Sequence, residues 1–302
     1  MDKPVIQLRS LRKVFRDFWM RPTVVALKGL DLEVRRGEVF GLLGPNGSGK
    51  STTIKMMLGL LRPTSGSIEI LGASPESTAV KSRIGYLPEL SHLHPFLTPR
   101  ETLSYYASLF GIEKREAARR ISQLLEMTGL TAAADRRVGG FSKGMARRVG
   151  LAQSLINAPE LLILDEPTSG LDPIGTREVK DLIRSLPAAG VTVLTTSHLL
   201  ADTEDICDRI AILNRGELCS EGDVGSLLRN SESKRFTVPG LSAEETEDVR
   251  GRLQRELGRP VEVDSPTVTL EKYFLQAVGK DRERQFRPAP FLCGESGADE
   301  QC

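Results

Sequence analysis

The sequence is short of several features that would assign it to other classes of protein. Its four cysteines show no Cys-x-x-Cys spacing, so no disulfide framework is indicated and a reducing compartment fits. No window approaches the roughly 18 consecutive apolar residues that a membrane-spanning helix needs, and the first residues do not open a signal peptide. We therefore expect a soluble, cytosolic chain, whose role at a membrane, if it has one, comes through a partner.

Charge of one sign is also missing. Lys and Arg number 41 against 40 Asp and Glu, which gives a net charge of +1 and no global field to attract nucleic acid. Paired basic residues recur at 119–120, 136–137 and 147–148, and we interpret them as solvated helix faces rather than a nucleic-acid surface.

The most informative stretch is a glycine-rich loop between an apolar run at 39–43 and a helical pattern at 53–58. Its residues are Gly44, Pro45, Asn46, Gly47, Ser48, Gly49, Lys50, Ser51 and Thr52. A strand, such a loop and a helix together are the context of a P-loop, in which backbone N–H groups surround phosphate oxygens. The helix adds its positive end, Lys50 adds a charge near the β- and γ-phosphates, and Ser51 has the hydroxyl expected to bind Mg²⁺.

A second stretch ends an apolar run at 161–164 with two acidic residues, Asp165 and Glu166. A fully apolar run is typical of a buried parallel strand, and α/β sheets bind ligands at the carboxyl ends of their strands. Asp165 would hold Mg²⁺ through water, and Glu166 would polarise the water that attacks the γ-phosphate. Alone, the motif also fits a solvated acidic turn, but the P-loop upstream favours the catalytic interpretation.

Periodicity outlines the fold. Alternating residues at 6–11 and 30–34 predict an antiparallel, half-exposed sheet, with an aromatic-rich loop at 15–23 between the two runs. Further strands are predicted at 67–71, 84–88, 191–196 and 209–213. Helices are predicted at 98–110, where Thr98 to Glu101 form a capping box, and at 117–125, 143–156 and 179–186.

These elements predict an α/β P-loop NTPase with a RecA-like core, an N-terminal antiparallel β-subdomain and an inserted α-helical subdomain. We expect this domain to span 1–230, with the helical insertion at about 88–157. A small C-terminal α/β extension follows at 231–279, with a capping box at Ser242 to Glu245. Residues 280–302 lack periodicity and are predicted to form a disordered tail.

A short segment between the two phosphate-site motifs makes the assignment specific. It consists of Phe141, Ser142, Lys143, Gly144 and Met145. In order and spacing, this segment, the motifs at 44–52 and 161–167, the run 169–172 and His198 resemble the ATP-binding subunits of ABC transporters over roughly 5–230. A generic P-loop kinase or GTPase lacks the segment, so the hypothesis that this protein is a P-loop kinase does not explain it.

The resemblance implies an ATPase that binds ATP and Mg²⁺ and assigns further roles residue by residue. Ser142 and Gly144 would contact the γ-phosphate of ATP bound to the other subunit, and Asp172 would lie at the interface between subunits. His198 would contact the γ-phosphate and support Glu166. Its position directly after the run 191–196 puts it at the same sheet end as Asp165.

Phe15 would stack on adenine, with Phe18 and Trp19 as alternatives. Two positions depart from the usual pattern of the family. Glu89 stands where Gln is usual; a carboxylate can bind Mg²⁺ but cannot donate an amide hydrogen bond. We expect Glu89 to contact Mg²⁺ and to relay to the membrane partner. Lys143 and Met145 stand where Gly and Gln are more common, and Lys143 either adds charge to the site of the other subunit or faces solvent.

The predicted function is to dimerise, with itself or a related ATPase subunit, around two ATP-Mg²⁺ and to power a separate transmembrane permease at the cytoplasmic face of a membrane. The insertion from about 88 to 129 would grip a helix of that permease. Resemblance favours exporters of lipids, polysaccharides or drugs.

The alternative is a soluble ABC ATPase that acts on ribosomes or DNA. Such proteins typically carry two nucleotide domains or a coiled-coil insertion, and this sequence has neither. We expect no nucleic-acid partner. The transported substrate does not follow from the sequence.

Overall fold

The computed structural model describes residues 3–19, 21–228, 238, 240–258, 261, 263 and 287–293. The chain divides into two compact units, of which the first comprises 1–227 together with 284–302 and the second comprises 228–283. Among the described residues, no helix is both long enough and apolar enough to cross a bilayer.

An antiparallel sheet opens the first unit. Its strands are β1 (Ile6–Arg16), β2 (Pro22–Val34) and β4 (Ser65–Ile70), in the order β2-β1-β4. The register pairs Phe15 with Val24. The sequence-based loop at 15–23 was therefore wrong at its ends, because aromatic and β-branched residues that face each other across strands extend the pairing.

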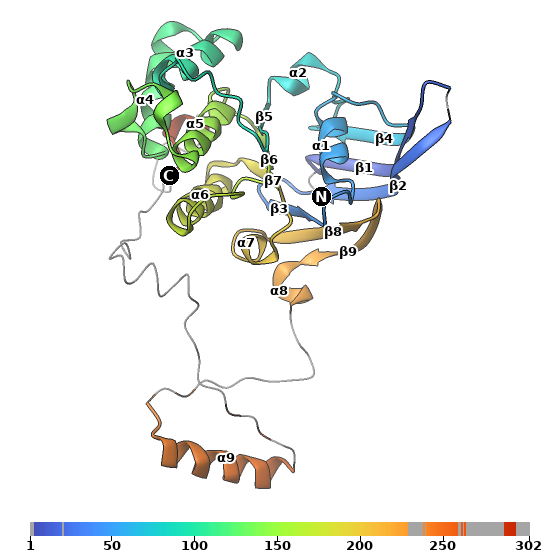
Figure 1. Ribbon diagram of the computed structural model, residues 1–302, viewed down its shortest axis with the longest axis vertical. Coiled ribbons are helices and arrows are strands. Elements are labelled where there is room, and N and C mark those ends of the chain that lie inside the picture. The colour runs from blue at the N-terminus through green and yellow to red at the C-terminus, as the bar shows by residue number, and fades with distance from the viewer. Residues whose placement is uncertain are drawn as a thin grey trace. The chain divides into compact units, whose positions relative to one another are not determined.

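The central sheet has the order β5-β6-β7-β3-β8-β9 (Figure 1). Its parallel strands are β3 (Val39–Leu43), β5 (Ile84–Leu87), β6 (Leu161–Asp165), β7 (Thr192–Ser197) and β8 (Arg209–Asn214). The edge strand β9 (Glu217–Asp223) pairs antiparallel with β8 and was not predicted. The parallel strands bring the ends of β3, β6 and β7 to one edge of the sheet, where ligands bind in such folds.

The core lies on both faces of this sheet, as the alternation along β6 shows. Leu161 and Ile163 pack in a cluster with the N-terminal sheet, whereas Leu162 and Leu164 pack with the helices on the other face. Successive strand residues point to opposite faces, so the apolar run of β6 buries both sides, as the sequence indicates.

Helices surround the sheet and form the insertion. The insertion contains α3 (Pro99–Leu109), α4 (Lys114–Met127), η1 (Thr131–Ala133), η2 (Val138–Gly140) and α5 (Lys143–Leu155). The predicted capping box is present, with the side chain of Thr98 accepting from Glu101 N and Pro99 in the first turn. The other helices are α1 (Lys50–Met57), α2 (Thr78–Lys81), α6 (Pro173–Ser185), η3 (Leu186–Ala189), α7 (Leu200–Glu204), α8 (Val224–Leu227), α9 (Ala243–Leu257) and η4 (Pro290–Leu292).

The second unit contains α9, which begins at the predicted capping box of Ser242 and Glu245. Of the predicted extension at 231–279, the structure describes only 238, 240–258, 261 and 263, and the rest of that prediction lies outside the described residues.

Part of the predicted tail has a defined place in the first unit. Residues 287–293 include η4, and Ala289 and Leu292 are buried among residues of the helical insertion. The backbone N–H of Ala289 donates to Sδ of Met127 at 3.2 Å, and the guanidinium of Arg120 lies 5.0 Å from the ring of Phe291. The prediction of a disordered tail therefore does not hold for these seven residues. A segment this short can bury two apolar side chains without showing any periodic pattern in its sequence.

Candidate nucleotide-binding site

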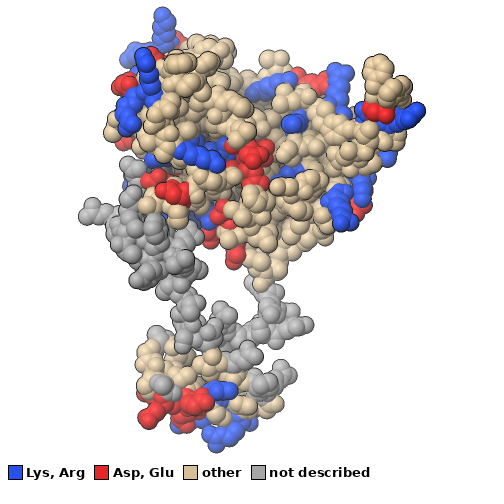
Figure 2. Space-filling model, in the orientation of Figure 1, with Lys and Arg blue, Asp and Glu red and all other residues tan. Residues whose placement is uncertain are grey.

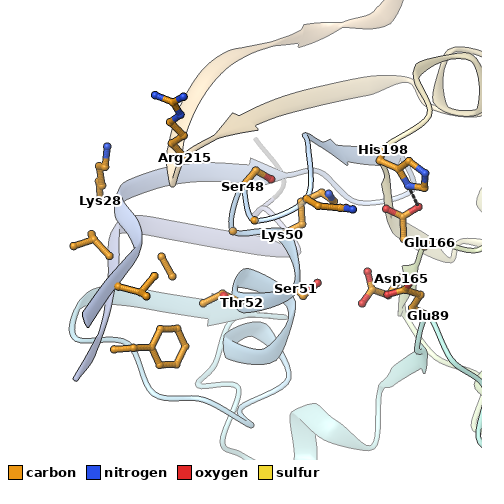
Figure 3. A pocket seen from close by; sticks show the side chains of 17 residues that line it. Lys28, Ser48, Lys50, Ser51, Thr52, Glu89, Asp165, Glu166, His198 and Arg215 are labelled. Carbon is orange, nitrogen blue, oxygen red and sulfur yellow. Dashed lines mark hydrogen bonds and ion pairs between the residues drawn. The ribbon is translucent and has the colours of Figure 1, made fainter. Parts of the chain in front are cut away.

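A cleft of about 610 Å³ opens at the edge of the central sheet where β3, β6 and β7 end (Figure 3). It brings together most of the predicted residues from five parts of the chain. The lining residues include Phe15, Asn46, Gly47, Ser48, Gly49, Lys50, Ser51, Thr52, Glu89, Asp165, Glu166 and His198.

The loop before α1 is shaped by its glycines. Gly44, Gly47 and Gly49 have φ of 151°, 80° and 113°, values that side-chain-bearing residues rarely adopt. A Cβ at Gly44 would also lie 2.2 Å from the carbonyl oxygen of Leu213. Gly49 occupies the N-cap position of α1 and makes no side-chain cap, so the first N–H groups of the helix are available to an anion.

Two polar side chains of this loop, those of Ser48 and Lys50, are buried. The buried Lys50 donates from Nζ to the carbonyl oxygen of Gly44 at 2.6 Å and to that of Pro45 at 3.4 Å. Ser48 Oγ is buried and has no hydrogen-bond partner within the described part of the chain. A buried hydroxyl without a partner is costly, and the positive charge of Lys50 at the uncapped N-terminus of α1 makes the loop suited to phosphate oxygens.

Two carboxylates stand at the end of β6, across the cleft from the loop. Thr196 on β7 organises both: its Oγ1 donates to Asp165 Oδ1 at 2.6 Å and accepts from the backbone N–H of Glu166 at 3.1 Å. Glu166 has a φ of 49°, a strained value that persists only where the surroundings enforce it. Its Oε2 lies 2.8 Å from Nδ1 of His198. Figure 3 shows this pair at one end of the cleft, with Asp165 and Glu89 side by side near Ser51.

Arg147 on α5 holds this strand end in place, a role that was not predicted from the sequence. Its guanidinium donates to the carbonyl oxygens of Asp165 at 2.6 Å, Glu166 at 2.8 Å and Pro167 at 3.0 Å. It also donates to the carbonyl oxygens of Pro88 and Glu89. A single side chain therefore joins the ends of β5 and β6 to α5.

The interpretation of Arg147 as solvated was wrong, since the residue is only 5% exposed. Burial lowers the pKa of its guanidinium to about 10, an effect opposed by the negative charges of Asp165 and Glu89. Arg147 is thus charged at neutral pH. The available signal was its spacing: it lies four and eight residues before the buried Leu151 and Leu155, on the apolar face of the helix.

The segment at 141–145, which distinguishes this sequence from those of generic P-loop kinases and GTPases, does not line this cleft. Ser142 is exposed and caps α5, its Oγ accepting from Met145 N at 3.2 Å. The side chain of Lys143 lies over Gly170, where an added Cβ would be 2.0 Å from Nζ. Asp172 is also exposed and caps α6, accepting from Gly175 N at 2.9 Å. The cleft of one chain therefore lacks Ser142, Lys143, Gly144, Met145 and Asp172.

Two basic residues in the cleft were not predicted. Arg215 has a φ of 50° in the turn between β8 and β9, and Lys28 lies on β2 with its Nζ 3.0 Å from Glu217 Oε1. A hydrogen bond of 3.0 Å from Lys28 N to the carbonyl oxygen of Gly216 joins the two segments. The two segments are far apart in the sequence, so no local pattern predicts this contact.

The fold and the cleft define a P-loop NTPase. Comparison with known proteins narrows this class, because residues 27–169 match the ABC transporter family model. An uncharacterized ABC transporter ATP-binding protein of Synechocystis sp. is 45% identical over 79% of this chain and 70% of its own length. The chain belongs to the ATP-binding proteins of ABC transporters, a family that hydrolyses ATP.

Two relatives with more informative names cover a similar part of the chain. The linearmycin resistance ATP-binding protein of Bacillus subtilis is 37% identical over 79% of this chain and 76% of its own length. The Nod factor export ATP-binding protein I of Cupriavidus metallidurans is 38% identical over 74% and 73%.

Solved structures agree with the fold. The ATP-binding subunit of an ABC transporter superposes with a TM-score of 0.65 at 31% identity, over 74% of this chain and 91% of that one. An ATP-binding cassette solved as a dimer with ADP and Pi has a TM-score of 0.65 at 26% identity, over 72% of this chain and 98% of that one.

Proposed function

We propose that two copies of this chain, or one copy and a related ATPase subunit, close around two ATP-Mg²⁺ and power a separate transmembrane permease that exports its substrate. The observation that carries the proposal is the division of the site. The cleft holds the phosphate loop and the carboxylates, whereas Ser142 and Gly144 lie on a surface outside it. A two-fold dimer would bring the segment of one chain to the cleft of the other.

Phosphate binding is assigned to the loop at 44–52. Its inward N–H groups, the N-terminus of α1 and the ammonium of Lys50 all favour an anion. Lys50 would exchange the carbonyl oxygen of Gly44 for phosphate oxygens, which are stronger partners because they are charged. At the other end of the cleft, the half-exposed Phe15 and its neighbours Val24 and Val25 offer an apolar surface for adenine.

The donor set beside the phosphate loop fits Mg²⁺. Ser51, Asp165 and Glu89 supply oxygen atoms only, and Mg²⁺ prefers such ligands together with phosphate oxygens and water. When bound, the ion would neutralise charge on the β- and γ-phosphates. Asp165 is already oriented for this role by its hydrogen bond from Thr196.

Glu166 is the proposed general base. Its backbone is fixed by Thr196 and Arg147, and its carboxylate by His198. A carboxylate held at one position can orient a water molecule in line with the γ-phosphate and accept its proton. His198 is 43% exposed at its side chain, so it can also reach the γ-phosphate directly. Asp172, now the cap of α6, would lie at the dimer interface.

We assign the contact with the permease to the helical insertion. Leu90, Phe96 and Leu109 are exposed there, and exposed apolar side chains that cluster on one subdomain favour a protein contact. Glu89 connects this surface to the cleft, because its carboxylate faces the cleft while its carbonyl is bound by Arg147. The chain would then sit peripherally at the cytoplasmic face of the membrane.

Export is supported by the relatives, whose names refer to Nod factor export and linearmycin resistance. We extend this direction to the present chain and propose a lipid, polysaccharide or drug-like substrate. Selectivity among these would reside in the permease.

The test is ATP hydrolysis by the purified chain and its Glu166→Gln variant. Loss of the general base should lower kcat by about 10²- to 10⁴-fold while ATP still binds. Glu69→Gln is the matched control, because Glu69 is exposed on β4 and does not line the cleft. Equal turnover by wild type and Glu166→Gln would overturn the assignment of Glu166.

A further inference from the structure

The end of the β1–β2 hairpin carries two exposed aromatic side chains. Phe18 is 92% exposed and Trp19 is 72% exposed. Their rings contact each other edge to face, with centroids 5.9 Å apart. In Figure 1 this hairpin extends away from the remainder of the first unit, so the two rings are at the end of a projecting element. Exposed aromatic pairs of this kind mark interaction sites.

The turn itself holds the rings outward. The backbone N–H of Asp17 donates to the carbonyl oxygen of Arg21 at 2.9 Å, and Arg21 N donates to Asp17 Oδ1 at 2.8 Å. The guanidinium of Arg21 lies 5.9 Å from the ring of Trp19. Neither Phe18 nor Trp19 lines the nucleotide cleft, which takes Phe15 from the adjoining strand. The pair is thus available for a role that the proposed function leaves unassigned.

The surroundings of the pair are basic. Residues 12–21 contain Arg12, Lys13, Arg16 and Arg21 against a single acidic residue. That residue, Asp17, uses its carboxylate to close the turn. In a chain with a net charge of only +1, this local excess is a distinct feature. Figure 2 shows basic and acidic groups next to the uncharged tip of the hairpin.

The small surface area of the aromatic pair argues against a protein partner. An aromatic side chain can bury about 150–250 Å², so two of them fall short of the roughly 800 Å² per partner that a stable protein interface requires. A bilayer sets no such minimum and deforms around a convex tip. Tryptophan is favoured at the lipid–water boundary, and Lys and Arg beside inserted aromatic groups are attracted to anionic headgroups.

We propose that this aromatic tip, Phe18 and Trp19 with the flanking Arg16 and Arg21, inserts into the interfacial region of an anionic phospholipid bilayer. The tip would give the chain a direct lipid contact in addition to the permease. It requires neither nucleotide nor dimerisation. Lipid binding can therefore fail while ATP hydrolysis succeeds, and the reverse.

Trp19 is the single tryptophan of the chain, so its fluorescence reports on the tip alone. The purified full chain is mixed with vesicles of phosphatidylglycerol and phosphatidylcholine, or of phosphatidylcholine only. We expect emission to shift to shorter wavelength with the anionic vesicles and to be quenched when their acyl chains are brominated. Unchanged emission with both vesicle types would overturn the proposal.

Vesicle co-sedimentation tests the individual side chains. Phe18→Ser should weaken binding by about ten- to a hundredfold, as expected when one aromatic group is no longer buried. Phe96→Ser is the matched control, because Phe96 is 75% exposed but lies on the helical insertion. Arg21→Gln should weaken binding to anionic vesicles and leave the weak binding to neutral ones unchanged.

Three other outcomes would contradict a lipid site. A shift in Trp19 emission on adding ATP without vesicles would assign the tip to the nucleotide site. Protection of Trp19 by detergent-solubilised permease, with no response to vesicles, would assign it to a protein partner. Equal loss of vesicle binding in Phe18→Ser and Phe96→Ser would show that the tip has no special role.

Discussion

The guanidinium of Arg147 donates a hydrogen bond of 2.8 Å to the carbonyl oxygen of Glu166. Arg147 lies on α5, five residues after Ser142, which caps the same helix. The helix that begins with the exposed segment at 142–145 is therefore hydrogen-bonded to the carboxylate end of β6. A contact made at Ser142 by a second chain could be transmitted to Glu166 through α5.

Arg147→Gln tests this connection. The change leaves several buried carbonyl oxygens at the ends of β5 and β6 without donors, and we expect a loss of about 3 kcal/mol in the free energy of unfolding. We also expect kcat to fall more than tenfold with little change in ATP affinity, because Glu166 is displaced while the phosphate loop is untouched. Urea unfolding and steady-state kinetics measure the two effects. A variant that is less stable but turns over normally when folded would limit Arg147 to a structural role.

His198→Ala tests whether His198 acts through Glu166. Loss of the 2.8 Å contact should lower kcat by about ten- to a hundredfold, because the carboxylate is no longer held in one orientation. Added to Glu166→Gln, the same change should cost less than it does alone, because only the direct contact of His198 with the γ-phosphate is then left to lose. Turnover numbers of the two single variants and the double variant provide the measurement. Fully additive losses would mean that His198 does not act through Glu166.

Glu116 on α4 gives the protein a pH-dependent contribution to stability. Hydrogen bonds from Arg119 and Arg120 lower the pKa of its carboxyl to about 2, from 4.5. Because the folded pKa is lower than the unfolded one, the contribution is complete above pH 4.5 and is lost as the pH falls toward 2. Solvent screening limits its size, so Glu116→Gln should cost about 0.5–1 kcal/mol at pH 7 and less at pH 3.

Urea unfolding of wild type and variant at the two pH values checks this difference. Glu126→Gln, an exposed position on the same helix, serves as the control. An equal cost of Glu116→Gln at pH 7 and pH 3 would argue against the ion pairs.

The segment at 287–293 predicts different effects for two changes at the C-terminus. Truncation after residue 230 should leave ATP binding intact, since among the described residues none that lines the cleft lies beyond Arg215. It should nonetheless lower stability, because Met127 and its neighbours lose the cover of Ala289 and Leu292. In the full chain, Leu292→Ala alone should cost about 2 kcal/mol.

Thermal or urea unfolding and nucleotide titration separate the two properties. Loss of ATP binding in the truncated chain would contradict the first expectation. Unchanged stability in Leu292→Ala would contradict the docked position of the segment.

Local patterns predicted the parts of the site that lie on single elements. The phosphate loop, the apolar strand before Asp165 and the capping box at Thr98 each combine neighbouring residues whose chemistry fixes a conformation. The P-loop fold and the family followed from the order of these motifs, and both are confirmed. The roles of individual side chains toward the nucleotide and toward a second chain remain predictions.

Long-range contacts account for what the sequence did not give. In the sequence, Arg147 resembles the other paired arginines. Its burial depends on the ends of β5 and β6, which are distant in sequence but lie beside it in the fold. Phe15 was assigned to a loop because its pairing with Val24 depends on the register of the whole hairpin. The hydrogen bond from Ala289 N to Met127 Sδ on α4 joins residues 162 positions apart, and no periodicity in the sequence predicts such a contact.

The central claim is that ATP is held between two chains, with Lys50 and Glu166 from one and Ser142 from the other. The most direct measurement is the molar mass in solution of Glu166→Gln with and without ATP and Mg²⁺. We expect a monomer without nucleotide, a dimer with ATP, and a return to monomer when Ser142→Arg is added, because a bulky cation would block the contact. A Glu166→Gln chain that binds ATP yet remains monomeric at every concentration, even together with its permease, would contradict it.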